Sequence, residues 1–290
     1  MIPAEFDYTR PASLGEALQV LHDRGGEAKV LAGGYSLIPL LKLRLGTPGI
    51  LVDIKDIGGL DGIAESDGEL RIGARATHAA IAASPLARGY PILGDTAAGI
   101  GDPQIRNWGT IGGSCAHADP SSDWPAVLIA MNGSLVCRSV GGERVVAARD
   151  FFLDSFQTAI EPDELLTEVR IPKPPPGSGS AYVKLERRTG DFATVGAAAQ
   201  LHLGGDGRID AVGIGLTAVA EAPFAATKAE NALHGAHPSA EMFREAGVAA
   251  AEQSRPVEDR HGPVDYKMAM VREMTERALA RAAERAGARG

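Results

Sequence analysis

Two glycine-rich segments carry the residue types best suited to holding a phosphate group. The first, Ala32-Gly33-Gly34-Tyr35-Ser36, falls between a short apolar strand predicted over 29–32 and an apolar helix predicted over 37–45. Adjacent glycines let backbone N–H groups approach an anion closely and allow positive φ angles. The segment therefore predicts an amide cradle for a diphosphate, and the same residues also fit a purely structural turn.

The second segment extends from Asp102 to Asp123 and predicts a long structured loop. Within it, Thr110-Ile111-Gly112-Gly113-Ser114 again places hydroxyl groups beside a glycine pair. Asp123 is suited to accept hydrogen bonds from ribose hydroxyls, as carboxylates do in other nucleotide sites. Loops this long are uncommon in a compact domain unless they are functional. Two glycine cradles in one domain favour an extended ligand of dinucleotide size.

A charged cluster with one aromatic residue follows later in the chain, at Lys184, Arg187, Arg188, Asp191 and Phe192. Charged residues are mostly exposed, so one interpretation is a solvated strand face. The other is a face that closes over a flavin-like ligand. In that case Phe192 covers an isoalloxazine ring, and Lys184 favours the reduced, anionic form of that ring.

Other common sites are absent from the sequence. It contains no G-x-G-x-x-G after a strand, no Walker A lysine, no H-E-x-x-H and no G-x-S-x-G. Cys115 and Cys137 are its only cysteines, too few for a disulfide framework, a cysteine zinc site or a cysteine-bound iron–sulfur cluster. We expect Cys115 to be a small buried residue rather than a reactive thiol.

Composition narrows the class of protein further. The chain has 290 residues, a formal net charge of −8, 36 glycines and only 5% aromatic residues. The negative charge argues against a main role in neutralising nucleic-acid phosphates or anionic lipid. No apolar run approaches the roughly 20 residues needed to cross a bilayer, and the N-terminal residues do not fit a signal peptide. We therefore expect a cytoplasmic protein.

The predicted elements divide the chain into two domains. A helix beginning near Ser13, two strands and a glycine-rich turn make up an α/β-like start, whereas Asp67-Gly68 and Gly141-Gly142 predict hairpins. A proline- and glycine-rich linker is predicted over 173–180. Strands over 181–188, 194–203 and 208–216 and helices over 223–233, 240–254 and 266–286 follow it. This order predicts an α+β protein, with a domain over 1–175 and a smaller α+β domain over 180–290.

The motifs in this order resemble those of the FAD-binding medium subunit of molybdenum hydroxylases, the group of carbon monoxide dehydrogenase, xanthine dehydrogenase and related aldehyde and N-heterocycle hydroxylases. The matching motifs are AGGYS at 32–36, DPQIRNWGTIGGS at 102–114, DPSSD at 119–123 and YVKLERRTGDFA at 182–193. The resemblance covers essentially the whole chain. It implies a two-lobe FAD domain of the vanillyl-alcohol-oxidase-like (PCMH) type, with lobes over about 1–56 and 57–175, followed by a C-terminal domain with an antiparallel sheet and helices.

The resemblance also implies the residues that bind FAD, with no catalytic or metal-binding residue among them. Asp123 would bind the ribose, Ile100 and Phe192 would lie near the ring system, and Lys184 and Asp191 would complete that part of the site. The diphosphate would be held from one lobe by Lys29, Val30, Leu31, Ala32, Gly33, Gly34, Tyr35, Ser36 and Leu37, and from the other by Thr110, Gly112, Gly113 and Ser114.

The implied role is one step of an electron-transfer relay. A large subunit with a molybdenum cofactor and a small subunit with iron–sulfur clusters would pass electrons to this FAD, which would reduce an external acceptor, in a dimer of heterotrimers. Carbon monoxide dehydrogenase-like subunits usually carry His where this chain has Tyr35, and Trp108 replaces what is often a charged or small residue. A self-contained two-lobe flavin oxidase or reductase acting on a small organic substrate, and a scaffold that binds nucleotide without catalysis, are the alternatives.

Overall fold

The N-terminal lobe is a small three-stranded parallel sheet covered by one helix. The computed structural model describes residues 1–287, so the last three residues of the domain predicted over 180–290 lie outside it. The strands of the N-terminal lobe lie in the order β1-β3-β2. Ala17 and Leu21 of the first helix pack against Val52 of the central strand. The elements of this lobe are β1 (Asp7–Thr9), α1 (Leu14–Arg24), η1 (Gly25–Glu27), β2 (Ala28–Leu31), α2 (Leu37–Leu43) and β3 (Ile50–Asp53).

The second lobe is a five-stranded antiparallel sheet with short helices on it. The sheet has the order β4-β5-β10-β6-β7, and the hairpins predicted at Asp67-Gly68 and Gly141-Gly142 are both confirmed. The strands of this sheet are β4 (Ile63–Ser66), β5 (Glu69–Gly73), β6 (Ser134–Ser139), β7 (Gly142–Ala147) and β10 (Leu165–Pro172). Strands β8 (Phe152–Asp154) and β9 (Gln157–Thr158) form a separate two-stranded sheet. The helices of this lobe are α3 (His78–Ala83), η2 (Leu86–Gly89), α4 (Pro91–Ala98), α5 (Pro103–Trp108), α6 (Ile111–His117), α7 (Asp123–Ala130) and α8 (Ala148–Phe151).

The prediction of a long loop over 102–123 is wrong, because this segment contains two short helices, α5 and α6. The side chain of Asp102 accepts a hydrogen bond from the N–H of Ile105 at 2.8 Å, and the side chain of Thr110 accepts one from Gly113 at 3.1 Å. Each helix therefore has an N-cap, and Pro103 is at the first position of α5, where proline is tolerated. These start signals outweigh the weak hydrophobic pattern of the segment.

The C-terminal domain pairs a four-stranded antiparallel sheet with three helices. The sheet has the order β11-β12-β13-β14, and α11 packs along β11 and β12. Strand β11 begins inside the predicted linker and ends at Leu185, so Arg187 and Arg188 lie in a loop rather than on the predicted strand face. The elements are β11 (Ser178–Leu185), β12 (Val195–Leu203), β13 (Ile209–Thr217), β14 (Phe224–Ala225), α9 (Thr227–Leu233), α10 (Ala240–Gln253) and α11 (Val264–Arg285).

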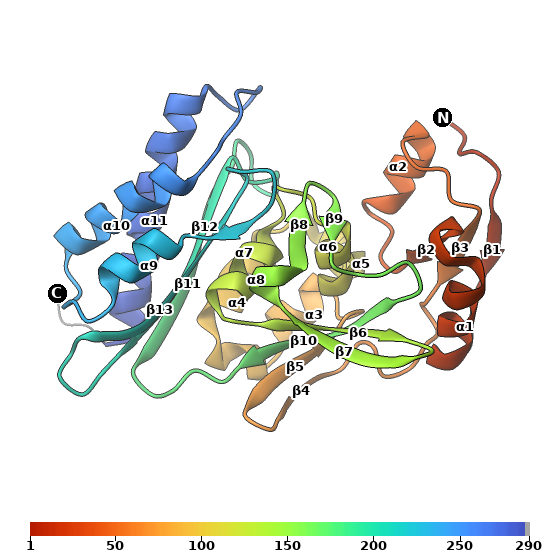
Figure 1. Cartoon of the computed structure of the whole chain (residues 1–290), viewed down its shortest axis with the longest axis horizontal. Helices are drawn as coiled ribbons and strands as arrows, with labels where there is room; N and C mark the ends of the chain where they lie inside the picture. The colour runs from red at the N-terminus through yellow and green to blue at the C-terminus, as the bar shows by residue number, and fades with distance from the viewer. Residues whose placement is uncertain (288–290) are drawn as a thin grey trace.

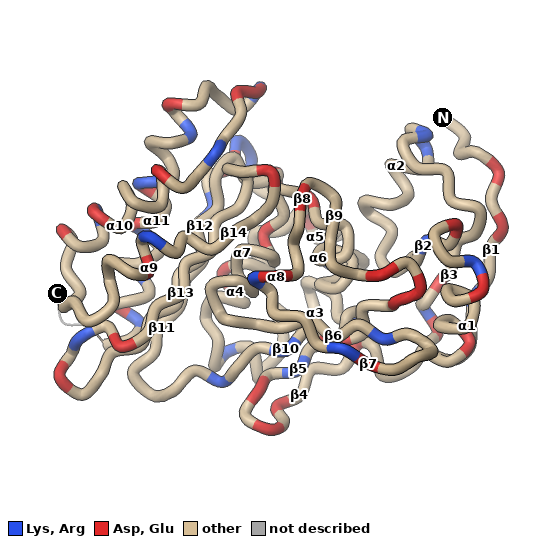
Figure 2. Tube along the Cα trace, viewed as in Figure 1, with Lys and Arg blue, Asp and Glu red and all other residues tan. Residues whose placement is uncertain are grey.

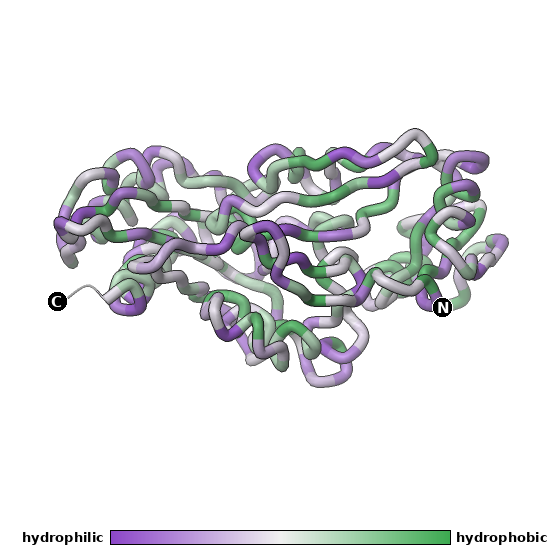
Figure 3. The backbone as a smooth tube through the Cα atoms, turned by 90° about the horizontal axis from the view of Figure 1, so that it is seen from below, coloured by the Kyte–Doolittle hydropathy of each residue, from purple (hydrophilic) through white to green (hydrophobic). Residues whose placement is uncertain are grey.

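The three units follow one another along the long axis of the molecule, with the N-terminal lobe and the C-terminal domain at opposite ends (Figures 1 and 3). Helix α7 lies at the junction of the second lobe and the C-terminal domain, and all eight of its residues are buried. It packs against β13, where a Cβ on Gly215 would lie 1.9 Å from the carbonyl oxygen of Ala126. Glycine is required there because the helix backbone touches the strand backbone.

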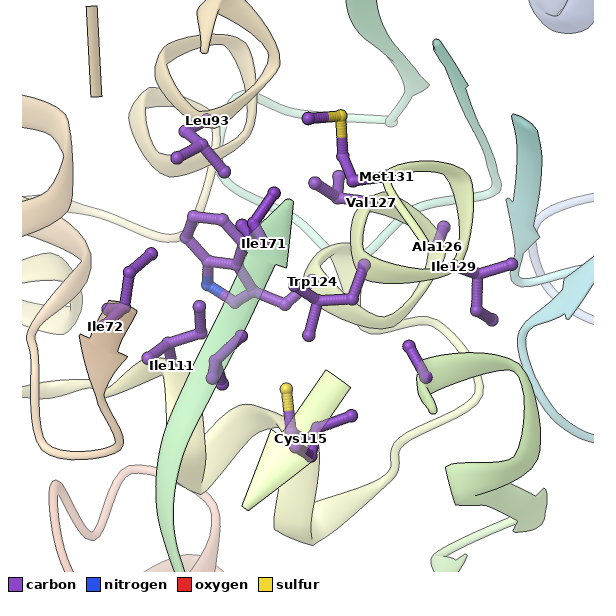
Figure 4. Packing of buried hydrophobic residues seen from close by; sticks show 14 of the residues in the cluster. Ile72, Leu93, Ile111, Cys115, Trp124, Ala126, Val127, Ile129, Met131 and Ile171 are labelled. Atoms are coloured by element: carbon purple, nitrogen blue, oxygen red, sulfur yellow. The ribbon is translucent and has the colours of Figure 1, made fainter. Parts of the chain in front are cut away.

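Trp124 is at the centre of the largest hydrophobic core (Figure 4). Its indole N–H donates a hydrogen bond of 3.0 Å to Nδ1 of His78, which is also buried. Burial, with a smaller contribution from the charge of Arg106, lowers the pKa of His78 to about 4. The imidazole is therefore neutral at pH 7 and can accept this hydrogen bond.

We expect His78 to make the folded protein less stable in mild acid. Between pH 6.5 and 4 the unfolded chain binds a proton at His78 that the folded chain does not, so stability falls as pH falls, by about 2 kcal/mol between pH 7.5 and 5. Thermal melting at the two pH values measures the loss. The variant His78→Gln keeps an acceptor and cannot titrate, so its loss should be smaller; equal losses in both proteins would contradict the assignment.

Candidate functional site

The first glycine segment presents a row of backbone donors. Within residues 1–287, no N–H from Gly33 to Leu37 donates to a protein acceptor. Gly34 has φ of 82°, a conformation that favours glycine. Tyr35 and Ser36 are exposed, so these N–H groups lie at the surface of the lobe. Such a set of unpaired donors suits an anion with several oxygens.

The two glycine segments meet across the two lobes. A Cβ on Gly33 would lie 2.3 Å from the carbonyl oxygen of Trp108 and 3.0 Å from Cα of Gly109. The loop after β2 is thus pressed against the junction of α5 and α6. The structure brings together the segments at 32–36 and 108–114, which the sequence places far apart.

The second segment contributes fewer donors than its composition suggests. The N–H groups of Ile111 and Gly112 donate to carbonyl oxygens of Ala76 and Ala74, and those of Gly113 and Ser114 donate to Thr110. Gly112 is a packing position, since a Cβ there would lie 2.4 Å from the side chain of Ala74. Gly113 is exposed, so this lobe offers a smooth surface for close approach.

Residues 29–32, which lead into the first glycine segment, differ in how far they are buried. Val30 and Ala32 pack against the core of the N-terminal lobe, and Val30 pairs with Val52 of β3 in the sheet. Leu31 lies close to the Gly34 position. Lys29 is exposed, and its charge helps burial to lower the pKa of His117 on α6.

Asp123 and Lys184 form an internal pair between the second lobe and the C-terminal domain. The carboxylate accepts a hydrogen bond from the hydroxyl of Tyr182, and Nζ of Lys184 lies 3.3 Å from its other oxygen. Burial raises the pKa of Asp123, and Lys184 opposes that shift; burial also raises the pKa of Tyr182, which therefore remains a donor. Both oxygens of Asp123 are thus engaged within the protein.

Lys184 has no hydrogen left for a ligand. Its Nζ lies 2.8 Å from the carbonyl oxygen of Gly99, 3.1 Å from that of Asp191 and 3.2 Å from Oε2 of Glu186, besides Asp123. An ammonium group has three donors, and four acceptors already surround this one. The geometry therefore does not support the idea that Lys184 acts on a flavin ring directly.

Exposed aromatic side chains lie at the predicted site, although aromatic residues are scarce in the chain. Tyr35, Trp108 and Phe192 are 44%, 53% and 57% exposed, whereas Ile100 is half-buried. Nζ of Lys55, from the N-terminal lobe, lies 5.1 Å from the centroid of the Trp108 ring. This cation–π contact joins the two lobes beside the glycine segments.

Two residues of the site escaped the sequence analysis. Arg106 donates to the carbonyl oxygens of Ile100 and Gly101, at 3.1 and 2.7 Å, and so holds the turn that carries Ile100. Lys55 contacts Trp108 as described above. Arg106 lies inside the motif at 102–114, which was the only available signal; nothing in the sequence marks Lys55.

The fold and the paired glycine segments define a two-lobe cofactor-binding protein with an added α+β domain. Residues 4–174 match the family model described as the FAD binding domain in molybdopterin dehydrogenase, and residues 180–282 match the CO dehydrogenase flavoprotein C-terminal domain. The chain belongs to the family of FAD-binding medium subunits of molybdenum hydroxylases. The expected fold class is confirmed.

Relatives in this family act on chemically different substrates. The chain is 45% identical to the carbon monoxide dehydrogenase medium chain of Afipia carboxidovorans, over 99% of both chains. It is 40% identical to the 6-hydroxypseudooxynicotine dehydrogenase complex subunit alpha of Paenarthrobacter nicotinovorans, over 99% of this chain and 97% of the relative. The structure of quinoline 2-oxidoreductase from Pseudomonas putida 86 matches with a TM-score of 0.92 at 36% identity, over 99% of both chains.

These comparisons define the chain as an FAD-carrying, electron-transferring oxidoreductase subunit of the molybdenum hydroxylase type. Its relatives are medium subunits of complexes that also have large and small subunits. In the complexes of these relatives, the molybdenum cofactor and the iron–sulfur clusters belong to partner subunits. Within residues 1–287, no group of three His, Cys, Asp or Glu side chains is placed to hold a metal ion. In the same residues, every helix is too short or too polar to span a bilayer.

Gly33→Ala is expected to impair FAD binding. The added methyl group would overlap the carbonyl oxygen of Trp108, so the lobes would have to move apart, and we expect the FAD dissociation constant to rise about tenfold or more. Titration of the apoprotein with FAD measures the change. Gly46→Ala is the matched control, because no atom lies within 4 Å of its Cβ position. Equal affinity in the two variants would contradict this geometry.

Trp108 is expected to report FAD binding by fluorescence. It is one of two tryptophans, and Trp124 is in the core. FAD should quench wild-type tryptophan emission, and Trp108→Phe should remove most of that quenching.

Lys55→Met should raise the FAD dissociation constant about two- to fivefold, the change that corresponds to loss of an exposed cation–π contact. Lys42→Met, an exposed position on α2, is the control. An unchanged dissociation constant in Lys55→Met would show that the contact of Lys55 with Trp108 does not support FAD binding.

Proposed function

We propose that FAD lies between the two lobes, with its diphosphate on the N–H groups of residues 33–37, and that its electrons pass to an external acceptor. The observation that carries the proposal is the row of unpaired donors pressed against the second lobe at Trp108 and Gly109. Charge-assisted hydrogen bonds of about 1.5–3 kcal/mol each can hold an anion without a lysine at its centre. We also propose that the FAD-binding domain spans residues 1–175, with its two lobes divided near residue 56, and that the C-terminal domain spans residues 180–290.

The residues of this chain bind and orient the cofactor. FAD, when bound, supplies the redox chemistry that side chains lack. Gly33 and Gly113 allow close approach of the backbone from the two lobes, and Lys29 adds positive charge on the side of the diphosphate. Tyr35, Trp108 and Phe192 present apolar surface that excludes water. Ile100, on the turn held by Arg106, completes this surface.

The positions predicted from the family resemblance have different supports. Thr110 keeps an N–H that donates to no acceptor within residues 1–287, and its hydroxyl caps α6. Ser114 is half-buried and shares a hydrogen bond with Ser122. For Asp123 we propose a ribose contact through the remaining lone pairs of its carboxylate. Asp191 is exposed beside Phe192.

The assembly that we propose is a dimer of heterotrimers in the cytoplasm, with the external acceptor reached from the flavin of this subunit. The presence of large and small partner subunits in this family supports the heterotrimer. Both cysteines are free and buried, which suits a reducing compartment. Light scattering of the complex purified with its partners tests the stoichiometry.

The purified complex is expected to contain about one FAD per copy of this chain. Acid release and chromatography identify the yellow compound, and the visible spectrum gives its amount. Bleaching of the flavin by the complex's substrate, and not by small organic donors added to the isolated chain, is the expected pattern. Steady turnover by the isolated chain would instead support a self-contained flavin oxidase. Flavin that stays oxidised in the active complex would support a nucleotide-binding scaffold.

A further inference from the structure

A single ammonium group ties together the two loops that carry the residues nearest the predicted flavin ring. Nζ of Lys184 contacts the carbonyl oxygens of Gly99 and Asp191 at 2.8 and 3.1 Å. The next residue after each carbonyl is Ile100 and Phe192, respectively. The position of both side chains therefore depends on one side chain of β11.

Lys184 is itself held from the second lobe. Asp123, the first residue of α7, contacts Nζ at 3.3 Å and accepts a hydrogen bond from Tyr182, which lies two residues before Lys184 on the same strand. Side chains two residues apart on a strand point to the same face. The side chains of Lys184 and Asp123 are each 8% exposed. Burial in this network restricts Lys184 to a narrow range of positions.

The two loops also touch one another directly. A Cβ on Gly190 would lie 2.6 Å from the carbonyl oxygen of Gly101, and both glycines have positive φ, 89° and 53°. Glu186 accepts a hydrogen bond from the N–H of Gly190 at 3.2 Å and contacts Lys184 at 3.2 Å. A shift of Lys184 would therefore move both loops together.

We propose that Lys184 is a positioning residue, held by Tyr182 and Asp123, which places Ile100 and Phe192 against the flavin. The chemistry favours this role over a direct charge effect because all the donors of Lys184 already face protein acceptors. Two carboxylates, of Asp123 and Glu186, also contact this one ammonium group, so its charge is more than balanced. The inference rests on the proposed FAD site.

The test is a double-mutant cycle on the full chain loaded with FAD, with Lys184→Met, Phe192→Ala and the combination. Lys184→Met is expected to raise the FAD dissociation constant about tenfold and to change the visible circular dichroism of the bound flavin. Because Lys184 acts in part through Phe192, the change should be clearly smaller in the Phe192→Ala background. Effects that add fully would overturn the positioning role and support a direct contact.

Two further variants separate positioning from loss of folding. Tyr182→Phe removes one donor to Asp123 without changing any charge, and should change the flavin spectrum in the same direction by a smaller amount. Lys184→Arg keeps the charge and the donors, and should restore part of the affinity. A Tyr182→Phe spectrum identical to wild type would count against the proposal, even if Lys184→Met fails to fold.

Lys173→Met is the matched control, because this lysine is 60% exposed and pairs only with Glu65 among the described residues. It should leave the dissociation constant and the spectrum unchanged. Failure of the wild-type chain to bind FAD would contradict the proposed function. Normal FAD binding by the wild type together with unchanged variants at 182 and 184 would contradict this inference alone.

Discussion

The structure depends on how the charge of Asp123 is compensated inside the protein. Helix α7 is otherwise apolar and lies buried between the second lobe and the C-terminal domain. A buried carboxylate is costly unless it is paired and hydrogen-bonded, and its partners, Tyr182 and Lys184, both come from β11. The two units must therefore pack in one register. The contact between the loops at 99–101 and 186–192 depends on this register, because one loop belongs to each unit.

A second constraint acts between the two lobes, where backbone meets backbone. The contact of Gly33 with the carbonyl oxygen of Trp108 leaves no room for a side chain. Because backbone positions do not depend on rotamers, the donors of residues 33–37 have a well-defined place relative to the second lobe. Acidic and basic residues are scattered over all three units (Figure 2). Because the donors of residues 33–37 are backbone groups, shape and backbone polarity characterise the site more than net charge does.

Much of the fold was predictable from local patterns, and the site was predictable only in part. The hairpin at Asp67-Gly68 follows from turn chemistry that is local to the residues involved, and the helix from Ser13 follows from its N-cap. The glycine segments were found because glycine pairs beside hydroxyl residues are a local signal. Their use by one ligand was expected, but the direct contact of Gly33 with the carbonyl oxygen of Trp108 was not predictable, since it depends on how the lobes pack. For the same reason the burial of Lys184 could not be predicted from local patterns, because two of its four acceptors, Gly99 and Asp123, come from segments distant in sequence.

Two titratable groups lie behind the second glycine segment, and neither is suited to proton transfer or nucleophilic attack. Nδ1 of His78 accepts the hydrogen bond from Trp124, and burial keeps its ring neutral, so that nitrogen is not available as a base. Burial raises the pKa of the Cys115 thiol far above its ordinary value, which removes it as a nucleophile. Neither group can take a proton from a substrate. What these residues do is pack the wall behind the glycine segments, and the redox step is left to the flavin that those segments suit.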